Sequence, residues 1–241
     1  MENTEKDIAV PMDISALDPA KCFFNPGCGL LMYKPQAVEK LHALLCAGFG
    51  KVGLFTDCCK KDPGLPAGSV VICDCAGCTK RFGTLYEGVS SVTLFEILAH
   101  CGDLPLPDHG GIKMSVQDPC YFRNRPHVHQ AVRTLLERMN IQVVDSEFSG
   151  QRSVCCGELL VDKLPIEKVL EKQKERCAQF PCEDVAVYCA ACQESIASGG
   201  KRGHYLMDLL IGEETHTTGL RLDEYRKHFR EYVDRTQFSA T

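Results

Sequence analysis

Two stretches of this sequence decide its fold: Val70-Val71-Ile72-Cys73-Asp74-Cys75-Ala76-Gly77-Cys78 and Val185-Ala186-Val187-Tyr188-Cys189-Ala190-Ala191-Cys192. In each stretch, a short run of β-branched and aliphatic residues leads directly into a C-x-x-C pair, and a helical pattern follows. This order is typical of a buried parallel strand that feeds into a helix. The two stretches therefore predict an α/β fold built on parallel sheet.

The residues around these stretches follow the same order twice. The first copy opens with Pro26-Gly27-Cys28 and the second with Asp118-Pro119-Cys120. A helical pattern comes next in each copy, at residues 35–45 and 128–139, and then a vicinal cysteine pair, Cys58-Cys59 or Cys155-Cys156. An apolar segment, at residues 91–98 or 204–210, closes each copy. An internal duplication explains this order, so we expect two similar lobes that face each other, each a small parallel sheet with flanking helices.

The duplication divides the chain into five parts. These are an N-terminal extension (1–21), the first repeat (22–101), a linker (102–113), the second repeat (114–212) and a C-terminal segment (213–241). The linker is rich in Pro and Gly, which interrupt helices and strands. In the last segment, apolar residues recur at helical spacing: Leu222, Tyr225, Phe229, Tyr232 and Val233. They predict an amphipathic helix at about residues 221–235, which we expect to pack on its own lobe, with docking to a partner as the alternative.

Composition narrows the class of protein. The 241 residues include 27 Lys and Arg against 32 Asp and Glu, so there is no basic footprint for nucleic acid or an anionic membrane. No stretch reaches the ~20 apolar residues of a membrane span, and the N-terminus has no signal-peptide pattern. We therefore expect a cytoplasmic protein without a membrane span. In a reducing compartment, 16 cysteines indicate metal or redox chemistry rather than a disulfide framework.

Each repeat contributes five cysteines in the same order. The first cysteine set is Cys28, Cys58, Cys59, Cys75 and Cys78, and the second cysteine set is Cys120, Cys155, Cys156, Cys189 and Cys192. A disulfide between vicinal cysteines is strained, because neighbouring Cα atoms are closer than a disulfide prefers. A C-x-x-C pair at the start of a helix can instead turn both sulfurs toward a metal, where free N–H groups stabilise their charge. We therefore predict that all ten cysteines are metal ligands.

The number of thiols favours iron–sulfur clusters over zinc. Zinc takes four ligands in structural sites, whereas each repeat supplies five thiols. Five also exceed the four of a cubane cluster, so the surplus indicates bridging sulfurs in a distorted cluster. Zinc in one half of the chain and a purely structural thiol-rich core remain open alternatives.

These motifs resemble the cysteine-rich CCG domain, which occurs in the B subunit of heterodisulfide reductase. It also occurs in iron–sulfur subunits of lactate, glycolate, glycerol-3-phosphate and thiol:fumarate oxidoreductases. Cys155-Cys156-Gly157 reproduces the tripeptide that names the family, and the resemblance covers residues 22–212. It implies noncubane [4Fe–4S] clusters, one or two per chain, near the interface of the lobes. In the heterodisulfide reductases, two such clusters cleave a disulfide by one-electron steps.

The first repeat departs from the family pattern. Only 15 residues separate Cys59 from Cys75, against 32 between Cys156 and Cys189, and Lys60 stands where the family has Gly. The shorter stretch leaves no room for a covering helix. We therefore expect a first site that is more open, holds a different cluster or zinc, or holds nothing.

Other residues carry weaker predictions. His127 and His129 are candidate proton donors to a cleaved thiolate, with surface or helix-start histidines as the alternative. Arg123 and Arg125 could clamp an anionic substrate or be solvated loop charges. Cys22 and Cys73 are possible replacement ligands in the first site. The remaining cysteines, Cys46, Cys101, Cys177 and Cys182, are expected to pack as small apolar residues.

The leading hypothesis is an enzyme subunit, a thiol or disulfide oxidoreductase that acts on a small thiol or disulfide. The sequence has no C-x-x-C-x-x-C-x-x-x-C-P run and no G-x-G-x-x-G fingerprint. Electrons would therefore come from or go to a partner protein that carries cubane clusters or flavin. The alternatives are an electron-transfer subunit of a lactate- or glycolate-type oxidation complex and a non-catalytic zinc-binding module.

Overall fold

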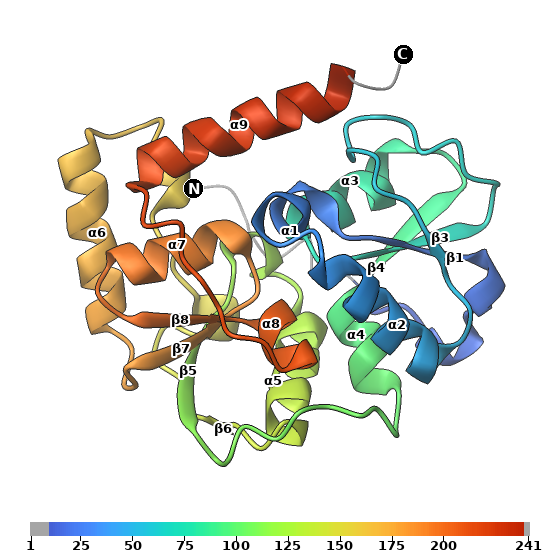
Figure 1. Cartoon of the computed structure of the whole chain (residues 1–241), viewed down its shortest axis with the longest axis horizontal. Coiled ribbons are helices and arrows are strands. Elements are labelled where there is room, and N and C mark those ends of the chain that lie inside the picture. Colours follow the sequence, from blue (N-terminus) through green and yellow to red (C-terminus); the bar gives the residue numbers. More distant parts are fainter. Residues whose placement is uncertain (1–9, 239–241) are drawn as a thin grey trace.

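The computed structural model describes residues 10–238 and shows two α/β lobes side by side (Figure 1). The sheet of the first lobe contains β1 (Cys22–Asn25), β2 (Gly53–Leu54), β3 (Ser69–Cys73) and β4 (Val89–Thr93) in the order β2-β1-β3-β4. The sheet of the second lobe contains β5 (Lys113–Gln117), β6 (Gln142–Val143), β7 (Asp184–Val187) and β8 (Arg202–Tyr205) in the order β6-β5-β7-β8. All strand pairs are parallel. The predicted α/β fold with two similar lobes is confirmed.

Helices connect and cover these strands. The first lobe has α1 (Gly27–Tyr33), α2 (Ala37–Phe49), α3 (Ala76–Leu85) and α4 (Leu94–His100), preceded by short 3-10 turns at Ile14–Ala16 and Pro19–Lys21. The second lobe has α5 (Pro126–Arg138), α6 (Ile166–Ala178), α7 (Ala190–Ser198) and α8 (Leu206–Ile211), with 3-10 turns η3 (Cys120–Phe122), η4 (Gly150–Arg152) and η5 (Glu158–Leu160). α6 lies in the longer stretch between Cys156 and Cys189, and the short stretch between Cys59 and Cys75 has no helix.

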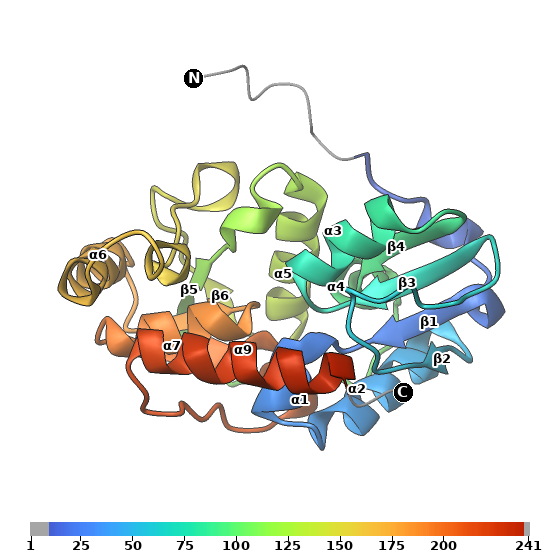
Figure 2. The ribbon, with the colours of Figure 1, turned by 90° about the horizontal axis from the view of Figure 1, so that it is seen from above.

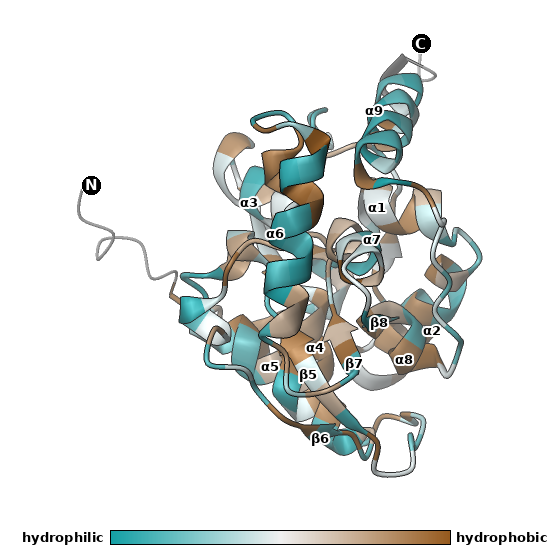
Figure 3. Ribbon diagram, turned by 90° about the vertical axis from the view of Figure 1, so that its left-hand side faces the viewer, coloured by the Kyte–Doolittle hydropathy of each residue, from teal (hydrophilic) through white to brown (hydrophobic). Residues whose placement is uncertain are grey.

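The local sequence explains several of these elements. Every residue of β3 and β7 is buried, as expected for central strands of a sheet that is covered on both faces. α4 begins with a capping box, in which the Thr93 side chain accepts from the N–H of Glu96 and the Glu96 side chain accepts from the N–H of Thr93. In Figure 3, β7 is mostly apolar, whereas α6 is mostly polar.

The two lobes share one apolar core. Buried residues of both lobes belong to it, and α4 packs on α5, α2 on α8 and α1 on α7. At the α1–α7 contact, a Cβ on Gly29 would lie 3.2 Å from the Cβ of Ala190, so the two helices approach closely. A buried ion pair also joins the lobes, because Lys34 Nζ lies 2.5 Å from Asp208 Oδ1. The lobes are therefore held in one arrangement.

The C-terminal helix α9 (Leu222–Phe238) runs across both lobes (Figure 2). Leu222 and Tyr225 pack with Val169 of α6, which belongs to the second lobe. Further along α9, Val233 packs with Cys28 and Cys58 of the first lobe. The helix predicted for residues 221–235 thus contacts both lobes rather than its own lobe alone, and residues 239–241 of the predicted C-terminal segment lie outside the described residues.

Within residues 10–238, no helix combines the length and the apolar character needed to cross a membrane.

Candidate metal centres

Parallel strands bring the cysteines to one edge of each sheet. Cys28 lies in the first turn of α1, directly after β1, and Cys120 begins η3, directly after β5. Cys75 and Cys189 are the N-cap residues of α3 and α7, and the second cysteine of each C-x-x-C pair lies in the first helical turn. The carboxyl ends of neighbouring parallel strands meet at the same edge, which is where α/β sheets place their sites.

The loops that carry the vicinal pairs are anchored by a polar residue at the end of β1 or β5. In the first lobe, Asn25 Nδ2 donates to the carbonyl oxygens of Phe55 (3.2 Å) and Asp57 (3.0 Å), just before Cys58. In the second lobe, Gln117, the last residue of β5, donates through Nε2 to the carbonyl oxygen of Val154 (3.2 Å), just before Cys155, and the buried carboxylate of Asp118 beside it accepts from the N–H of Gly150 (2.6 Å). Neither anchor was predicted from the sequence, although Asn25 and Gln117 each stand three residues before the opening cysteine of their repeat, which was a signal.

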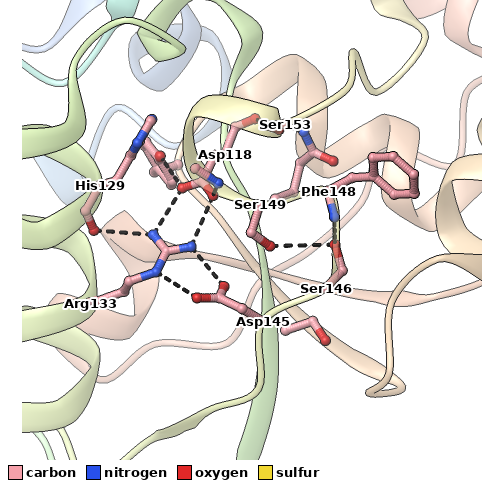
Figure 4. A network of polar contacts seen from close by, with 12 residues as sticks. Asp118, His129, Arg133, Asp145, Ser146, Phe148, Ser149 and Ser153 are labelled. Atoms are coloured by element: carbon pink, nitrogen blue, oxygen red, sulfur yellow. Dashed lines mark hydrogen bonds and ion pairs between the residues drawn. The ribbon is translucent and has the colours of Figure 1, made fainter.

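Asp118 is the centre of a polar network (Figure 4). It accepts from Arg133 Nη1 (3.1 Å) and Nη2 (2.9 Å) and from the hydroxyl of Tyr188 (2.5 Å), and Arg133 also binds Asp145. Burial acts to raise the pKa of Asp118, but the hydrogen bonds and charge of Arg133, with Tyr188 and Gly150, outweigh it and lower the pKa. The main-chain carbonyl of Asp118 accepts from the Ser153 hydroxyl (2.5 Å), which ties the loop to the end of β5. The network thus holds the segment that leads to Cys155.

Each cysteine set forms a continuous chain of thiol contacts. In the first set, the thiols lie close enough to shift the pKa of their neighbours, in the order Cys28, Cys58, Cys59, Cys78 and Cys75. In the second set, the order is Cys120, Cys155, Cys156, Cys192 and Cys189. The opening cysteine contacts the first member of the vicinal pair in both, and the second member contacts the last cysteine. The structure therefore gathers each set predicted from the sequence, and in the same internal order.

The close packing of thiols makes one of them acidic in each set. The pKa of Cys58 is lowered to about 2, because the thiols of Cys28 and Cys59 donate hydrogen bonds to its sulfur. The pKa of Cys155 is lowered to about 2 through hydrogen bonds from its own neighbours in the chain of thiols. The pKa of Cys28 is raised, first because it donates to Cys58 and then because it is buried. In each set, the first cysteine of the vicinal pair thus favours the thiolate, which is the form that binds a metal.

Helix starts stabilise further charge. The pKa of Cys75 is lowered to about 6, first by a hydrogen bond from the Cys78 thiol and, against the effect of burial, by main-chain N–H groups of Gly77 and Cys78. These are the free N–H groups of the first turn of α3. Gly27 lies against this turn with φ of +65°, and a Cβ there would come within 3.1 Å of the Cys75 Cβ. A side chain at position 27 would therefore be strained and would crowd the first set.

The five thiols of the first set line a cavity of about 380 Å³. Tyr121, from the second lobe, and Phe229 and Val233, from α9, complete its apolar wall. Among residues 10–238, no three His, Cys, Asp or Glu side chains converge closely enough to hold a single metal ion. The donor set is nevertheless suited to an iron–sulfur cluster, because all five donors are soft sulfurs that surround a space rather than a point.

The remaining cysteines lie outside these chains. Cys73, the last residue of β3, is fully buried and packs in one apolar cluster with Cys78, whereas Cys22 packs in the main core and donates to the carbonyl of Asp18. Cys177 is buried in α6 and donates to the carbonyl of Ile196. Cys46, Cys101 and Cys182 are free thiols, as are all the others.

The candidate proton donors and anion clamp lie on other contacts. His127 Nε2 is 3.6 Å from Glu96 Oε1 of the first lobe, and His129 is buried; burial lowers the pKa of both. Among residues 10–238, neither imidazole is hydrogen-bonded to a cysteine of the two sets. Arg123 donates through Nε and Nη2 to the carbonyl of Ser153, and Arg125 lines a separate cavity beside Glu96. Their functional roles stay predictions.

Comparison with known proteins gives one distant relative. The chain is 26% identical over 104 residues to a probable membrane-anchored ferredoxin of Chromohalobacter salexigens, a match that covers 42% of this chain. The match spans 16% of the length of that relative. No protein-family model matches the chain. The fold and the two cysteine sets thus define a two-lobed α/β protein with duplicated thiol sites, distantly similar to a ferredoxin.

Proposed function

We propose that this chain is an iron–sulfur protein in which each cysteine set holds one cluster. We further propose that it acts on thiols or disulfides as an oxidoreductase subunit of the heterodisulfide reductase B type. The observation that carries the proposal is the chain of five thiols, repeated in the same order at the carboxyl edge of both sheets. The name of the distant relative, a ferredoxin, supports iron–sulfur chemistry.

Zinc explains the sites less well. A structural zinc ion uses four ligands in tetrahedral geometry and leaves a fifth thiol without a role. Duplication of a surplus thiol, in the same contact order, supports a ligand function for all five. In a cluster of several irons, all five cysteines of a set would serve as ligands.

When bound, such clusters supply one-electron transfer and an iron position where an exogenous sulfur can enter. The residues of this chain prepare and protect the sites. First-turn N–H groups of α3 stabilise thiolate charge at Cys75, and the Asp118 network holds the loop before Cys155. Val233 of α9 covers Cys28 and Cys58 and limits access of water to them.

The cavity supports a substrate role for the first site. The five thiols line a cavity of about 380 Å³, of which a bound cluster would fill the part next to the sulfurs, and the cavity extends to the apolar side chains of Tyr121, Phe229 and Val233. Tyr121, which follows Cys120 of the second set, also lines this cavity. One small thiol or disulfide in the cavity would therefore lie near both sites. In this proposal a partner protein with cubane clusters or flavin exchanges electrons with the chain, and a cytoplasmic location remains our expectation.

Metal analysis of anaerobically purified protein tests the proposal. We expect about eight irons and eight sulfides per chain if both sets are loaded, and about four of each if one is, from the composition of four-iron clusters. EPR of the reduced protein should show paramagnetic iron–sulfur signals. Stoichiometric zinc without iron would overturn the proposal and support a zinc-binding module.

A second candidate function is electron transfer within a lactate- or glycolate-type oxidation complex. The printed name of the relative, a ferredoxin, favours it. The two candidates differ in their response to substrate. A cluster that only relays electrons should keep the same EPR and visible spectra when small thiols or disulfides are added, whereas a substrate-binding site should change them.

A further inference from the structure

Comparison of the two lobes shows where the first site differs from its duplicate. In the second lobe, Ser195 lies three residues after Cys192 and its hydroxyl donates to the carbonyl of Cys156 (2.9 Å). In the first lobe, Arg81 lies three residues after Cys78 and its Nε donates to the carbonyl of Cys59 (3.3 Å). The two residues therefore have equivalent places and the same main-chain acceptor, but Arg81 adds a positive charge.

A second cation is added at the same site. Lys60 follows the vicinal pair of the first lobe, where the second lobe has Gly157. Lys60 and Arg81 both line the cavity of the first set. Among residues 10–238, neither has a carboxylate partner, and the Nη atoms of Arg81 have no hydrogen bond. The first site thus carries two cations that its duplicate lacks, and both border open space.

The charges beside the second set are arranged differently. Arg226 forms ion pairs with Glu158 and Asp162, so its charge is offset within the protein. At the first cavity, Arg230 is similarly paired with Asp162 (2.5 Å), and the exposed carboxylate of Asp234 lies at the wall. Apart from the thiols, the wall of the cavity therefore carries two cations without a carboxylate partner among the described residues, Lys60 and Arg81, and one exposed carboxylate, Asp234.

We propose that the first cavity binds the acidic group of an anionic thiol or disulfide through Arg81 and Lys60. This inference rests on the proposed function and narrows its substrate class. A guanidinium matches a carboxylate or phosphate through paired hydrogen bonds, and Arg81 has its Nη donors free for such a contact. Tyr121, Phe229 and Val233 provide an apolar wall for the carbon chain between the acidic group and the sulfur. The sulfur would then lie among the cysteine thiols that line the same cavity.

Three thiols of similar size test the inference on the full, cluster-loaded chain. They are 3-mercaptopropionate, 3-mercapto-1-propanol and cysteamine, which are anionic, neutral and cationic. Each is titrated anaerobically while visible absorption and EPR spectra are recorded. We expect the anionic thiol to bind about tenfold more tightly than the neutral one, the size typical of one charge-assisted hydrogen bond, and the cationic thiol to bind most weakly.

Variants that copy the second lobe supply the controls. Arg81→Ser introduces the residue that fills the equivalent place in the second lobe, and Lys60→Gly does the same after the vicinal pair. Each should bring the ratio of anionic to neutral binding toward one, with iron content unchanged. Lys80→Ser removes the same charge from the same helix at an exposed position outside the cavity wall, and it should keep the wild-type ratio.

The outcomes separate this inference from the proposed function. Equal binding of all three thiols, or an unchanged ratio in both Arg81→Ser and Lys60→Gly, overturns the inference and leaves the proposed function standing. A lower iron content or a shifted reduction potential in these variants, with the ratio unchanged, also overturns it, since the cations would then only offset the charge of the ligands. If no thiol changes any spectrum, the disulfide function itself fails, and the inference fails with it.

Discussion

Replacing Lys34 by Met should lower the free energy of unfolding more than replacing the lysine of an exposed ion pair by Met. Lys34 follows the last residue of α1 in the first lobe, and its side chain is 7% exposed; Asp208, in α8 of the second lobe, is fully buried. Lys34 Nζ donates to Asp208 Oδ1 (2.5 Å) and to the carbonyl of Glu214 (3.0 Å). Without the lysine, the Asp208 carboxylate would stay buried without a cation at that distance.

The size of the effect follows from what remains around Asp208. Breaking a buried pair by removing one partner costs about 3–5 kcal/mol. The hydroxyls of Tyr33 (2.6 Å) and Thr215 (3.1 Å) still donate to Asp208 in the variant, so we expect the lower end, about 3 kcal/mol. Urea unfolding of anaerobic protein, followed by circular dichroism, measures the change in the free energy of unfolding.

Two further variants make the reasoning falsifiable. Lys40→Met breaks an exposed pair with Glu213, also between the lobes, in which the lysine side chain is 59% exposed, and it should cost less than about 1 kcal/mol. The double variant Lys34→Met/Asp208→Leu removes both buried charges and should be more stable than Lys34→Met alone. The explanation is wrong if Lys34→Met costs no more than Lys40→Met, or if the two changes of the double variant simply add.

Three other outcomes are expected. Cys156→Ala should lower the iron content by about half, because it removes the middle thiol of the second cysteine set. Cys177→Ala should leave the iron content unchanged, because the Cys177 thiol donates to the carbonyl of Ile196. Equal iron loss in the two variants would contradict the assignment of Cys156 as a ligand and Cys177 as a core residue. Asp118→Asn should reduce the iron content of the second set and lower the free energy of unfolding by roughly 2–4 kcal/mol, because the amide cannot balance the charge of Arg133. Full iron content in a colorimetric assay would show that Asp118 does not anchor the loop before Cys155. The pKa of Asp184 is lowered, first by the hydrogen bond from Arg202 and, against the effect of burial, by His204. The ionised Asp184 therefore stabilises the folded protein fully above its ordinary pKa of 3.8, and this stabilisation is lost as the pH falls through the lower pKa of the folded state. Asp184→Asn should make acid unfolding, followed by circular dichroism, less steep between about pH 4 and 2.

Much of the fold could be predicted because its signals are local. The runs before Cys75 and Cys189 encode buried strands through their β-branched residues, and the C-x-x-C pairs mark the turn into a helix. Because those signals occur twice in the same order, the sequence alone indicated two similar lobes, and the structure has two sheets of identical strand order. The ten cysteines that the structure gathers into two chains were likewise identified from spacing, without any knowledge of their contacts.

Other features depend on contacts between residues far apart in the chain, and the sequence could not predict them. The pattern of α9 predicted a helix, but only the packed lobes show that Val233 reaches Cys28 and Cys58. Asp118 resembled part of an opening motif, and its role as an anchor became visible only with Arg133 and Gly150 around it.

The charged residues of the first site also combine features that the sequence predicts with features that depend on the tertiary structure. The sequence shows Lys60 and Arg81, and Lys60 stands where the family that it resembles has Gly after its cysteine pair. Whether either side chain forms an ion pair with a carboxylate cannot be predicted from the sequence. That depends on which carboxylates the fold brings near. The tertiary structure places Asp162 beside Arg226 and Arg230, whereas within the described part of the chain Arg81 is hydrogen-bonded only to the carbonyl of Cys59. Local periodicity and spacing thus determined the strands, helices and ligand sets, because hydrophobic pattern and turn chemistry act over a few residues. The pairing of charges and the cover over the thiols were decided only by tertiary packing, because electrostatic and apolar contacts act between any surfaces that the folded chain brings together.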